Sequence, residues 1–548
     1  MGTSGDIHKA VTQYHDGKTI DMIRIHFAVS FLILLGCCAT LSAEQAAKRP
    51  NILFIFSDDH AINAISAYGG DLADVAPTPN IDRLAKEGML FRNSFCANSI
   101  CGPSRATILT GKHSHKNGFM RNSGQGMDQS QWTLSKSLQA AGYNTAVIGK
   151  WHLKTDPLGF DYWEILPGQG NYYNPNFIQQ DGSTKRFPGY VTDITTDKTI
   201  AWLEKRDTSK PFFLMCQHKA PHRTFAPPLR YLGAFDEVEI PEPATLFDDY
   251  ANRSETLATN EMEIDRHLDW AYDLKVRKDE RGDVVLPEPD RYGTPEYNRM
   301  NDEQKATWNA HFGPRNEAFL KDFQAGKLSD KDIVRWKYRR YMQNYLGTVK
   351  AVDENVGRLL KYLDDNGLSE NTVVVYSSDQ GFYLGEHGWY DKRWMFEESM
   401  RMPLIVRWPG VAEPQSVEPR LVQNIDYAPT FLEMAGLTVP AEIQGRSLVP
   451  LLKSENVDWR KSLYYAYYEL GEHAVPQHFG VRTETHKLIH FPVTQEWNLF
   501  DLEADPNEMV SIYDDPSAVD VRDSLKQEYD RLRNVYDAPP LPKPAKRR

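Results

Sequence analysis

Residues 52–60, which read Ile-Leu-Phe-Ile-Phe-Ser-Asp-Asp-His, decide the fold class of this chain. A continuous apolar run is typical of a strand that is covered on both faces, as in a mostly parallel sheet. Similar runs stand at 145–148, 212–215 and 373–376, and stretches with helical patterns separate them. This alternation predicts an α/β fold, in which helices sandwich one large, mostly parallel sheet.

The longest predicted helix spans about 332–366, where apolar residues form one stripe and Gly367 supplies a stop signal. A shorter helix is expected to open at Thr78-Pro79 and to close at Gly88. Residues 240–331 are charged and irregular and contain several prolines. We therefore expect this segment to form a surface excursion that shapes access to the substrate.

The last part of the chain changes character near residue 458. Short β-like runs stand at 463–468, 487–491 and 497–500, and a charged helical stretch follows at about 525–536. This pattern predicts a small antiparallel sheet with one helix. The predicted organisation is a leader at 1–43, a catalytic α/β domain at 49–455 and a small C-terminal α+β subdomain at 456–548.

The N-terminal segment resembles a secretory signal. An apolar run at 27–41 follows Arg24, is too short to span a membrane comfortably, and ends in small residues. Cleavage near Ala43, lipidation of Cys37 and a retained anchor all stay open, because Leu34-Leu35-Gly36-Cys37 only partly matches a lipoprotein box. We expect an exported protein, periplasmic or secreted, with lipid anchoring as the alternative and no stable membrane span in the mature chain.

Composition excludes several classes of function. Among 548 residues, 63 are basic and 75 are acidic, which gives a net charge of −12. Such a chain has no basic excess to neutralise phosphates, which argues against a general nucleic-acid binder. An anion would bind only in a local cationic pocket. Cleavage near Ala43 leaves Cys96, Cys101 and Cys216. Three cysteines in an exported chain of this size do not make a disulfide scaffold, and an odd number leaves at least one unpaired.

Polar side chains follow all four predicted strands, at the edge where ligands bind in open α/β sheets. Asp58 and Asp59 follow the first strand, and Gly149-Lys150-Trp151-His152 follows the second. Residues 216–222, which end in His222, follow the third, and Ser377-Ser378-Asp379-Gln380 follows the fourth. Maintenance of the fold alone does not explain four such endings together.

The carboxylates in this set indicate a metal site. Asp58, Asp59 and Asp379 would repel one another without compensation, and a hard divalent cation with oxygen ligands supplies it. Gln380 can add a neutral carbonyl oxygen. Ligands that are all oxygen favour Ca²⁺ or Mg²⁺ over Zn²⁺. For any one of these aspartates taken alone, capping or turn formation at a strand end is the alternative.

Four cationic or titratable side chains are expected at the same edge: Lys150, His152, His222 and Lys392. Lysines hold anionic groups, and histidines can move protons near neutral pH. A lone lysine in a loop is usually only solvated. A Lys-x-His sequence directly after a core strand, beside a metal site, instead favours a functional role for the lysine.

The stretch Cys101-Gly102-Pro103-Ser104-Arg105 places a cysteine at the start of a predicted helix. Backbone N–H groups and the helix dipole favour negative charge there. A plain cysteine in this position could be a thiolate nucleophile of low pKa. Arg105 would lie one turn further along, on the same side, where it could hold an anionic oxygen.

The combined motifs resemble those of the type I sulfatases, within the alkaline phosphatase superfamily. The resemblance covers nearly all of the chain after about residue 50. It is carried by Asp58-Asp59, Cys101-Gly102-Pro103-Ser104-Arg105 with Leu109-Thr110-Gly111-Lys112, Gly149-Lys150-Trp151-His152, Ala220-Pro221-His222, Ser378-Asp379-Gln380-Gly381, Gly385-Glu386-His387 and Lys392.

This resemblance implies the cofactors. Cys101 would be oxidised to formylglycine (3-oxoalanine) by a formylglycine-generating or equivalent maturation enzyme. One Ca²⁺ per chain would be held by residue 101 together with Asp58, Asp59, Asp379 and Gln380. The family often has Asn where this chain has Gln380, and both residues offer an amide oxygen.

The resemblance also implies the catalytic roles. The hydrated aldehyde of residue 101 would attack sulfur in line, and Arg105 would stabilise that group. Lys150, His222 and Lys392 would hold sulfate oxygens. His222 would give a proton to the departing alcohol, and His152 would take the remaining hydroxyl proton when sulfate is released.

Residues 168–175 and 385–393 resemble bacterial polysaccharide sulfatases, including N-acetylglucosamine-6-sulfatase-like enzymes. The resemblance implies a sulfated poly- or oligosaccharide as the substrate. His387 is a candidate contact to a substrate hydroxyl, and Tyr172, Tyr173 and Trp389 are candidates for stacking on sugar rings, with ordinary packing as the alternative. A phosphate or phosphonate monoester hydrolase and an inactive glycan-binding homologue are the competing hypotheses.

Overall fold

The computed structural model describes residues 49–544. The predicted leader, with the cleavage site near Ala43 and the lipidation site at Cys37, lies outside the described residues.

A ten-stranded mixed sheet forms the centre of the described chain, in the order β13-β2-β12-β9-β1-β8-β4-β5-β6-β7. Its middle consists of β9 (Thr372–Ser378), β1 (Asn51–Asp58), β8 (Phe212–Pro221) and β4 (Asn144–Lys150), which pair in parallel. The predicted mostly parallel sheet is therefore confirmed. On one side the sheet continues with β12 (Leu404–Arg407), β2 (Met89–Phe91) and β13 (Ser416–Glu418). On the other side it continues with β5 (Tyr162–Leu166), β6 (Asn176–Gln179) and β7 (Thr184–Arg186).

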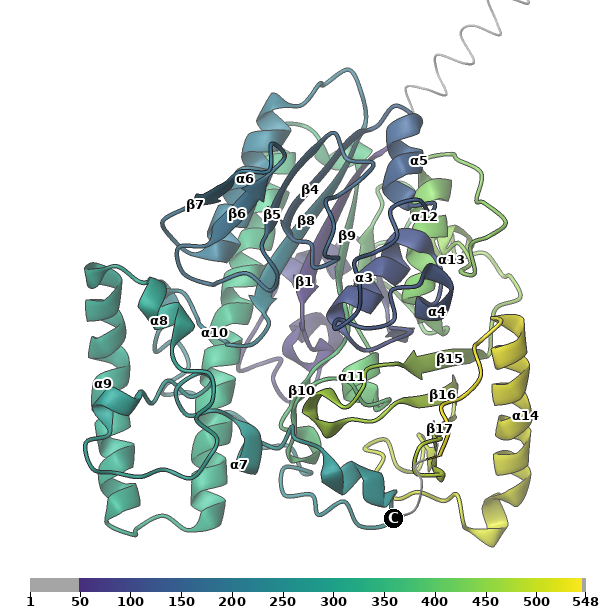
Figure 1. The fold of residues 1–548 in the computed structure, drawn as a ribbon. Coiled ribbons are helices and arrows are strands. Elements are labelled where there is room, and N and C mark those ends of the chain that lie inside the picture. Colours follow the sequence, from purple (N-terminus) through teal and green to yellow (C-terminus); the bar gives the residue numbers. More distant parts are fainter. Residues whose placement is uncertain (1–48, 545–548) are drawn as a thin grey trace, which may run out of the picture. The chain divides into compact units, whose positions relative to one another are not determined.

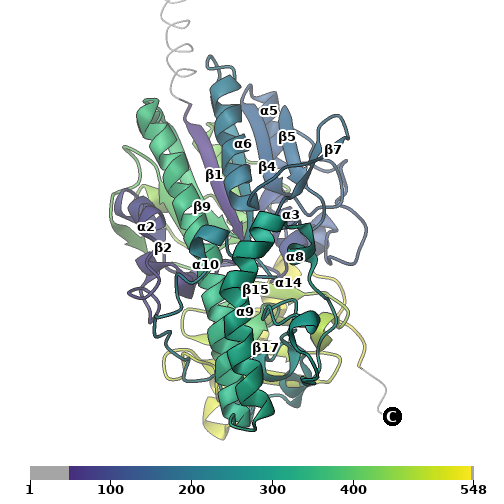
Figure 2. The same ribbon diagram turned by 90° about the vertical axis from the view of Figure 1, so that its left-hand side faces the viewer.

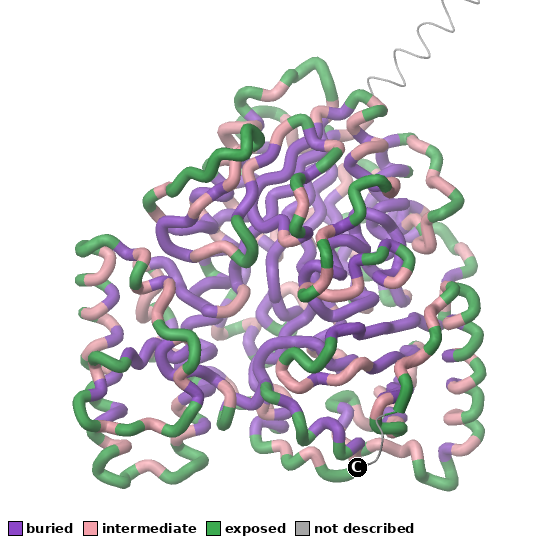
Figure 3. Tube along the Cα trace, in the orientation of Figure 1, coloured by how far each residue is buried: buried purple, intermediate pink, exposed green. Residues whose placement is uncertain are grey.

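Helices cover both faces of this sheet (Figures 1 and 2). Side chains of β1 alternate between two cores: Ile52 and Phe54 point to one, and Leu53 and Ile55 to the other. Figure 3 shows these central strands buried. The first core contains α3 (Cys101–Thr110), α5 (Leu134–Ala140) and α12 (Tyr427–Met434); the second contains α2 (Pro79–Lys86), α6 (Val191–Lys205) and α10 (Asp330–Asp365).

The long helix α10 begins two residues before its expected start. A capping box explains this boundary, because the Ser329 side chain accepts from the backbone of Asp332 while the Asp332 carboxylate accepts from the backbone of Ser329. Further along, Val352, Val356 and Leu359 are fully buried. The apolar stripe therefore packs in the core.

The expectation of an irregular excursion at 240–331 is partly wrong. This segment contains the 23-residue helix α9 (Asp302–Gln324), and short helices α7 (Ile264–His267) and α8 (Pro295–Arg299) precede it. Helix α9 packs along α10, where the rings of Phe319 and Trp336 lie 3.9 Å apart (Figure 1). The prolines suggested a break, but Pro314 lies inside the helix. Burial of Trp308, Phe312 and Phe319 on one face outweighs that interruption.

The C-terminal part forms the predicted small antiparallel sheet, in the order β15-β16-β17-β18. Its strands are β15 (Ser462–Tyr467), β16 (His478–Thr483), β17 (His486–Phe491) and β18 (Glu496–Asp501), and α14 (Val519–Val535) packs on it. Strand β16 was not predicted, because Gly480 and polar residues interrupt its apolar pattern. The domain boundary between 455 and 456 stays a prediction.

The remaining short elements are β3 (Ser94–Phe95), β10 (Tyr383–Leu384), β11 (Tyr390–Asp391), β14 (Val422–Gln423), α4 (Ser114–Asn117), α11 (Glu397–Met400) and α13 (Val449–Leu452). Across residues 49–544, none of the helices is both long and apolar enough to cross a membrane.

Candidate active site

The carboxyl ends of the four central strands bring the candidate residues together. Asp58 is the last residue of β1, and Lys150 is the last residue of β4. Asp379 directly follows β9, and His222 directly follows β8. Parallel pairing puts these ends at one edge of the sheet, so residues far apart in sequence meet there.

Three carboxylates form the acidic part of the site. One ligand oxygen from each of Asp58, Asp59 and Asp379 lies within 4.8 Å of the others, and all three side chains are buried. The backbone N–H of Asp59 donates to Asp379 Oδ1 over 3.1 Å. Burial raises the pKa of Asp59 to about 7, although the charge of Lys392 opposes this shift. The cluster thus holds negative charge where water cannot stabilise it.

The same atoms fit a hard cation. Within residues 49–544, Asp58 Oδ1 and Gln380 Oε1 are buried without a hydrogen-bond partner. A buried oxygen without a partner is costly, and a cation with oxygen ligands would satisfy both atoms. The Gln380 side-chain amide donates to Asp379 Oδ1 over 2.8 Å, which fixes it beside the carboxylates.

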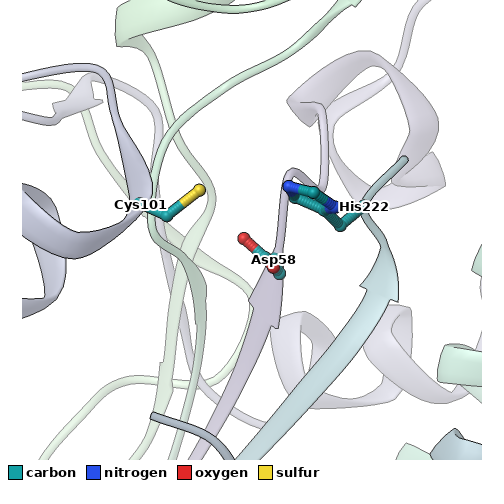
Figure 4. A group of neighbouring side chains, drawn as sticks. All are labelled: Asp58, Cys101 and His222. Atoms are coloured by element: carbon teal, nitrogen blue, oxygen red, sulfur yellow. The ribbon is translucent and has the colours of Figure 1, made fainter. Parts of the chain in front are cut away.

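Cys101 is the first residue of α3 and faces this cluster. Its Sγ lies within 4.8 Å of one ligand atom each from Asp58 and His222, and Figure 4 shows the three side chains pointing toward one another. Burial raises the pKa of the Cys101 thiol to about 12, and Lys392 only partly opposes this. The alternative of a plain thiolate with a low pKa is therefore wrong, because desolvation outweighs the helix N-terminus.

Arg105 is held rigidly between the strand ends. Its Nε donates to Asp379 Oδ2 over 3.0 Å, and its Nη2 lies 3.7 Å from Asp58 Oδ1. Its Nη1 donates to the Lys150 carbonyl over 2.6 Å and to Gln217 Oε1 over 2.9 Å. These contacts fix the guanidinium one turn after Cys101, as the sequence spacing suggested.

The two lysines contact different carboxylates. Lys150 Nζ pairs with the Asp58 carboxylate and donates to the Gln169 side chain. Lys392 Nζ lies 2.7 Å from Asp59 Oδ2 and 3.4 Å from Asp391 Oδ1. Burial disfavours the ammonium of Lys392, but the charge of Asp59 holds its pKa above the usual range. Both lysines therefore stand beside the acidic cluster.

His222 is oriented by a backbone carbonyl. Its Nδ1 lies 2.6 Å from the Arg223 carbonyl oxygen, which can only accept, so Nδ1 carries the proton. Its Nε2 lies 3.6 Å from Asp59 Oδ2. Burial, and then the charges of Lys150 and Lys392, lower the pKa of His222 well below its usual value. The ring is thus neutral at pH 7, with Nε2 facing the cluster.

Comparison with known proteins identifies the family. The model of the family described as "Sulfatase" matches residues 50–281 and 284–437, and that described as "N-sulphoglucosamine sulphohydrolase, C-terminal" matches 385–535. The chain belongs to the sulfatase family. It is an enzyme, a sulfuric ester hydrolase, and the resemblance drawn from its motifs is confirmed.

Individual relatives show which kinds of sulfatase this chain is similar to. The sulfatase is 46% identical to an N-acetylglucosamine-6-O-sulfatase of Bacteroides thetaiotaomicron over 92% of this chain and 89% of that protein. It is 26% identical to human N-acetylglucosamine-6-sulfatase over 80% of this chain and 71% of that protein. A solved structure with 46% identity and a TM-score of 0.84, which covers 89% of this chain and 98% of that one, contains its substrate D-glucosamine-2-N,6-O-disulfate.

Reasoning from sequence missed three residues of the site in the sulfatase. Gln217 binds Arg105, Gln169 binds Lys150, and Lys219 Nζ donates to the Arg223 carbonyl over 3.2 Å. The carbonyl that orients His222 therefore also accepts from Lys219. The position of Gln217 and Lys219 could have indicated a role in the site, because β8 continues to Pro221 and carries both residues to the edge of the sheet where the active site lies.

The structure gives no support to His387 as a contact for substrate. Its side chain is fully buried, with Nδ1 3.1 Å from Asp248 Oδ2 and Nε2 3.9 Å from Glu398 Oε2. Arg253 Nη1 lies 3.2 Å from the same Nδ1. His152 follows β4 with a φ of 58°, and its Nδ1 is buried without a partner within residues 49–544. The roles of both histidines stay predictions.

The three aromatic candidates for stacking on sugars are packing residues. Trp389 is fully buried and stacks on Tyr250, with ring centroids 5.3 Å apart. Tyr172 and Tyr173 are also buried, and their hydroxyls donate to the carbonyls of His222 and Pro227. Tyr172 thereby supports the loop that carries His222, which is a structural role.

Proposed function

We propose that this sulfatase hydrolyses the 6-O-sulfate ester of glucosamine residues in a glycan. The observation that carries the proposal is Cys101 Sγ, at the first turn of α3, facing Asp58 and His222 between carboxylates and lysines. The 46% identity to an N-acetylglucosamine-6-O-sulfatase over almost the whole chain supports the choice of sugar.

The nucleophile in this proposal is residue 101 after conversion of its cysteine to formylglycine by a maturation enzyme. The hydrated aldehyde supplies an oxygen nucleophile for the sulfur atom and a second hydroxyl through which sulfate can leave. The high pKa of the unmodified thiol supports the need for this conversion, since a buried neutral thiol is a poor nucleophile.

Ca²⁺ is the proposed metal. Asp58, Asp59, Asp379 and Gln380 would hold it together with residue 101, and all four side chains offer oxygen ligands. When bound, the ion supplies positive charge for the sulfate oxygens. Magnesium is the competing choice, since it also prefers oxygen ligands.

The cationic side chains would bind and orient the ester. Lys150 and Lys392 would hold sulfate oxygens, and the Arg105 guanidinium would neutralise charge beside residue 101. Their present partners, Asp58, Asp59 and Asp379, are the proposed metal ligands. A bound cation would take over those carboxylates and leave the ammonium groups for the anionic substrate.

His222 is the proposed proton donor to the departing alcohol. The Arg223 carbonyl holds Nδ1–H, so any second proton must reside on Nε2. The lysines that depress the pKa of His222 would be paired with the ester, whose negative charge then favours the imidazolium. His152, close in sequence to Lys150, is proposed to take the hydroxyl proton when sulfate is released.

Two alternatives carry less support. A phosphate or phosphonate monoester hydrolase could use the same groups, and matched sulfate and phosphate esters of one sugar would separate it from a sulfatase by kcat/KM. An inactive glycan-binding protein would have no reason to keep three buried carboxylates around a cysteine. Export remains part of the proposal, because a sulfated glycan polymer is an extracellular substrate.

Mass spectrometry of the peptide that carries residue 101 tests the nucleophile. Protein produced together with a maturation enzyme should show formylglycine at that residue and release sulfate from 6-O-sulfated N-acetylglucosamine. The Cys101→Ser variant should show no multiple turnover, and the 3-O-sulfated sugar serves as a matched control substrate. Full turnover with unmodified cysteine throughout would refute the proposed nucleophile, and preference for the 3-O-sulfate would refute the proposed position.

A further inference from the structure

Arg223, which directly follows His222 in the chain, forms a buried ion pair with Asp273. Arg223 Nε donates to Asp273 Oδ1 over 2.7 Å, and Nη2 donates to Oδ2 over 2.5 Å. The Asp273 side chain is fully buried, and that of Arg223 is 12% exposed. Two parallel bonds from a guanidinium to a carboxylate fix direction as well as distance. The pair therefore joins the loop that carries His222 to the segment 240–331.

The turn 269–275, which contains Asp273, is itself held in place. Asp273 Oδ2 also accepts from the Asp269 N–H over 2.9 Å. From the helices behind the turn, Arg340 of α10 and Asn316 of α9 donate to backbone carbonyls of this turn over 3.0 and 2.8 Å. The two long helices thus fix the position of the carboxylate that receives the guanidinium.

The backbone at the other end of the ion pair orients His222. The Arg223 carbonyl accepts from His222 Nδ1 over 2.6 Å and from Lys219 Nζ over 3.2 Å. The next carbonyl, that of Thr224, accepts over 2.6 Å from Nζ of Lys275, which lies in the same turn as the carboxylate. A peptide unit that is bound through its side chain and through two successive carbonyls can rotate little. The direction of the imidazole ring follows from this anchorage.

Aromatic rings enclose the guanidinium of Arg223. Its Cζ lies 5.2, 5.3 and 5.1 Å from the ring centroids of Tyr272, Tyr292 and Tyr390. A solvated pair on the surface would contribute little and would hold no fixed geometry. Stability alone would be served as well by two apolar side chains, because burial of two charges costs about as much as their attraction returns. Its location beside His222 suggests that geometry is what this pair supplies.

We propose that Asp273 is a positioning residue for catalysis, which acts through Arg223 to hold the carbonyl that orients the His222 ring. The inference rests on the proposed function, in which His222 gives a proton to the departing alcohol. A general acid must stand within about 2.6–3.2 Å of the oxygen that it protonates, so a ring that turns away loses rate. Segment 240–331 thereby supports the proton donor.

A double variant, Arg223→Met/Asp273→Asn, removes the pair without leaving one buried charge unpaired. Methionine keeps a long side chain among the tyrosines, and asparagine can still accept from the Asp269 N–H. Arg223→Lys keeps one charged bond to Asp273 and should lose less activity than the double variant does. Should the double variant fail to fold, Arg223→Lys and Asp273→Asn carry the same test.

The matched control is Arg281→Met/Asp290→Asn, at a second buried pair of segment 240–331. Arg281 Nη1 lies 2.8 Å from Asp290 Oδ2, and these side chains are 8% and 10% exposed. Within residues 49–544, neither of them bonds the loop that carries His222. The control should therefore release sulfate at the rate of the parent.

Single-turnover release of sulfate, with enzyme in excess and with the formylglycine content of each variant measured, gives the rates. His222→Ala should slow release by about 10²- to 10⁴-fold, the usual contribution of a general acid. Loss of the Arg223–Asp273 pair should slow it by about tenfold to a hundredfold through a displaced donor. In the His222→Ala background the same loss should change the rate by less than about threefold, because the group through which the pair acts is gone.

A loss that disappears in the His222→Ala background, with a thermal midpoint near that of the parent, would establish the positioning role. An unchanged rate in the folded double variant, equal losses in both backgrounds, or an equal loss in the Arg281→Met/Asp290→Asn control would overturn it. If His222→Ala released sulfate at the parental rate, the proposed proton donor would fail and this role with it. A slow His222→Ala beside a fully active double variant would refute the positioning role alone.

Discussion

At the scale of single residues, the active site depends on side chains that neutralise one another. Arg105 bonds both Asp379 and Gln217, Lys150 pairs with Asp58, and Lys392 pairs with Asp59 and Asp391. Residue type and position after a strand predicted the carboxylates and Lys150, and the family resemblance added a role for Lys392. Gln217 could not be predicted in the same way, because a glutamine near a strand end has many uses and only the fold shows that it meets Arg105.

Gln217 is expected to position Arg105. In Gln217→Ala, Arg105 Nη1 loses one of its two acceptors, so kcat/KM should fall by about tenfold to a hundredfold, the range of one hydrogen bond to a charged group. The loss should appear mainly in kcat if the guanidinium acts on the transition state. Gln217→Glu keeps an acceptor and should lose less. An unchanged kcat in Gln217→Ala would contradict this role.

Removal of the proposed Ca²⁺ should destabilise the enzyme as well as inactivate it. Three buried carboxylates would then repel one another, so chelation should lower the thermal midpoint, and added Ca²⁺ should restore it in proportion to the logarithm of its concentration. Gln380→Ala should weaken that dependence on Ca²⁺, because it removes one oxygen ligand. Equal midpoints with chelator and with excess Ca²⁺ would argue against a metal among these aspartates.

At the scale of elements, the ends of helices were harder to predict than their existence. Thr78-Pro79 marked the start of α2 correctly, but the Thr78 side chain bonds Asp82 instead of capping the helix. The cap comes from Asp353 of α10, whose Oδ1 accepts from the N–H groups of Asn80 and Ile81 over 3.0 and 2.9 Å. Sequence patterns report local partners, and this partner is distant in the chain.

Loss of this cap should destabilise the fold. Asp353→Ala leaves two backbone N–H groups at the start of α2 without their acceptor, so the free energy of unfolding should fall by about 1–3 kcal/mol. Asp365→Ala is the control: this exposed residue of the same helix pairs, within residues 49–544, only with Lys361, and its loss should lower the free energy of unfolding by well under 1 kcal/mol. Denaturant unfolding measures both. Equal stabilities for the two variants would count against the cap.

At the scale of the whole molecule, several histidines are buried in their neutral form. His478 lies in the small sheet, far from the proposed metal ligands in sequence, and its ring packs against Tyr465, Tyr467 and Phe491. Burial lowers its pKa from 6.5 to about 4. Between these values the unfolded chain binds the additional proton, so stability rises with pH there and is lost as pH falls from 6.5 toward 4.

Acid should therefore destabilise the enzyme in part through His478. Its contribution to this loss is roughly 3 kcal/mol over the whole window, since one pKa unit corresponds to about 1.4 kcal/mol. His478→Phe removes the titration and should flatten the dependence of unfolding free energy on pH between 6.5 and 4. The variant also loses a bond to the Pro476 carbonyl, which shifts stability equally at every pH. A parent and a variant with the same slope would contradict this account.

The sequence by itself determined the α/β fold, the small C-terminal sheet, and the set of carboxylates, lysines and histidines at the strand ends. It could do so because burial on both faces requires continuous apolar strands, and parallel strands deliver their endings to one edge. Only the tertiary structure decided that Trp389 and His387 are buried, that Gln217 holds Arg105, and that Asp273 holds Arg223. These features depend on contacts between distant segments, which no local pattern records.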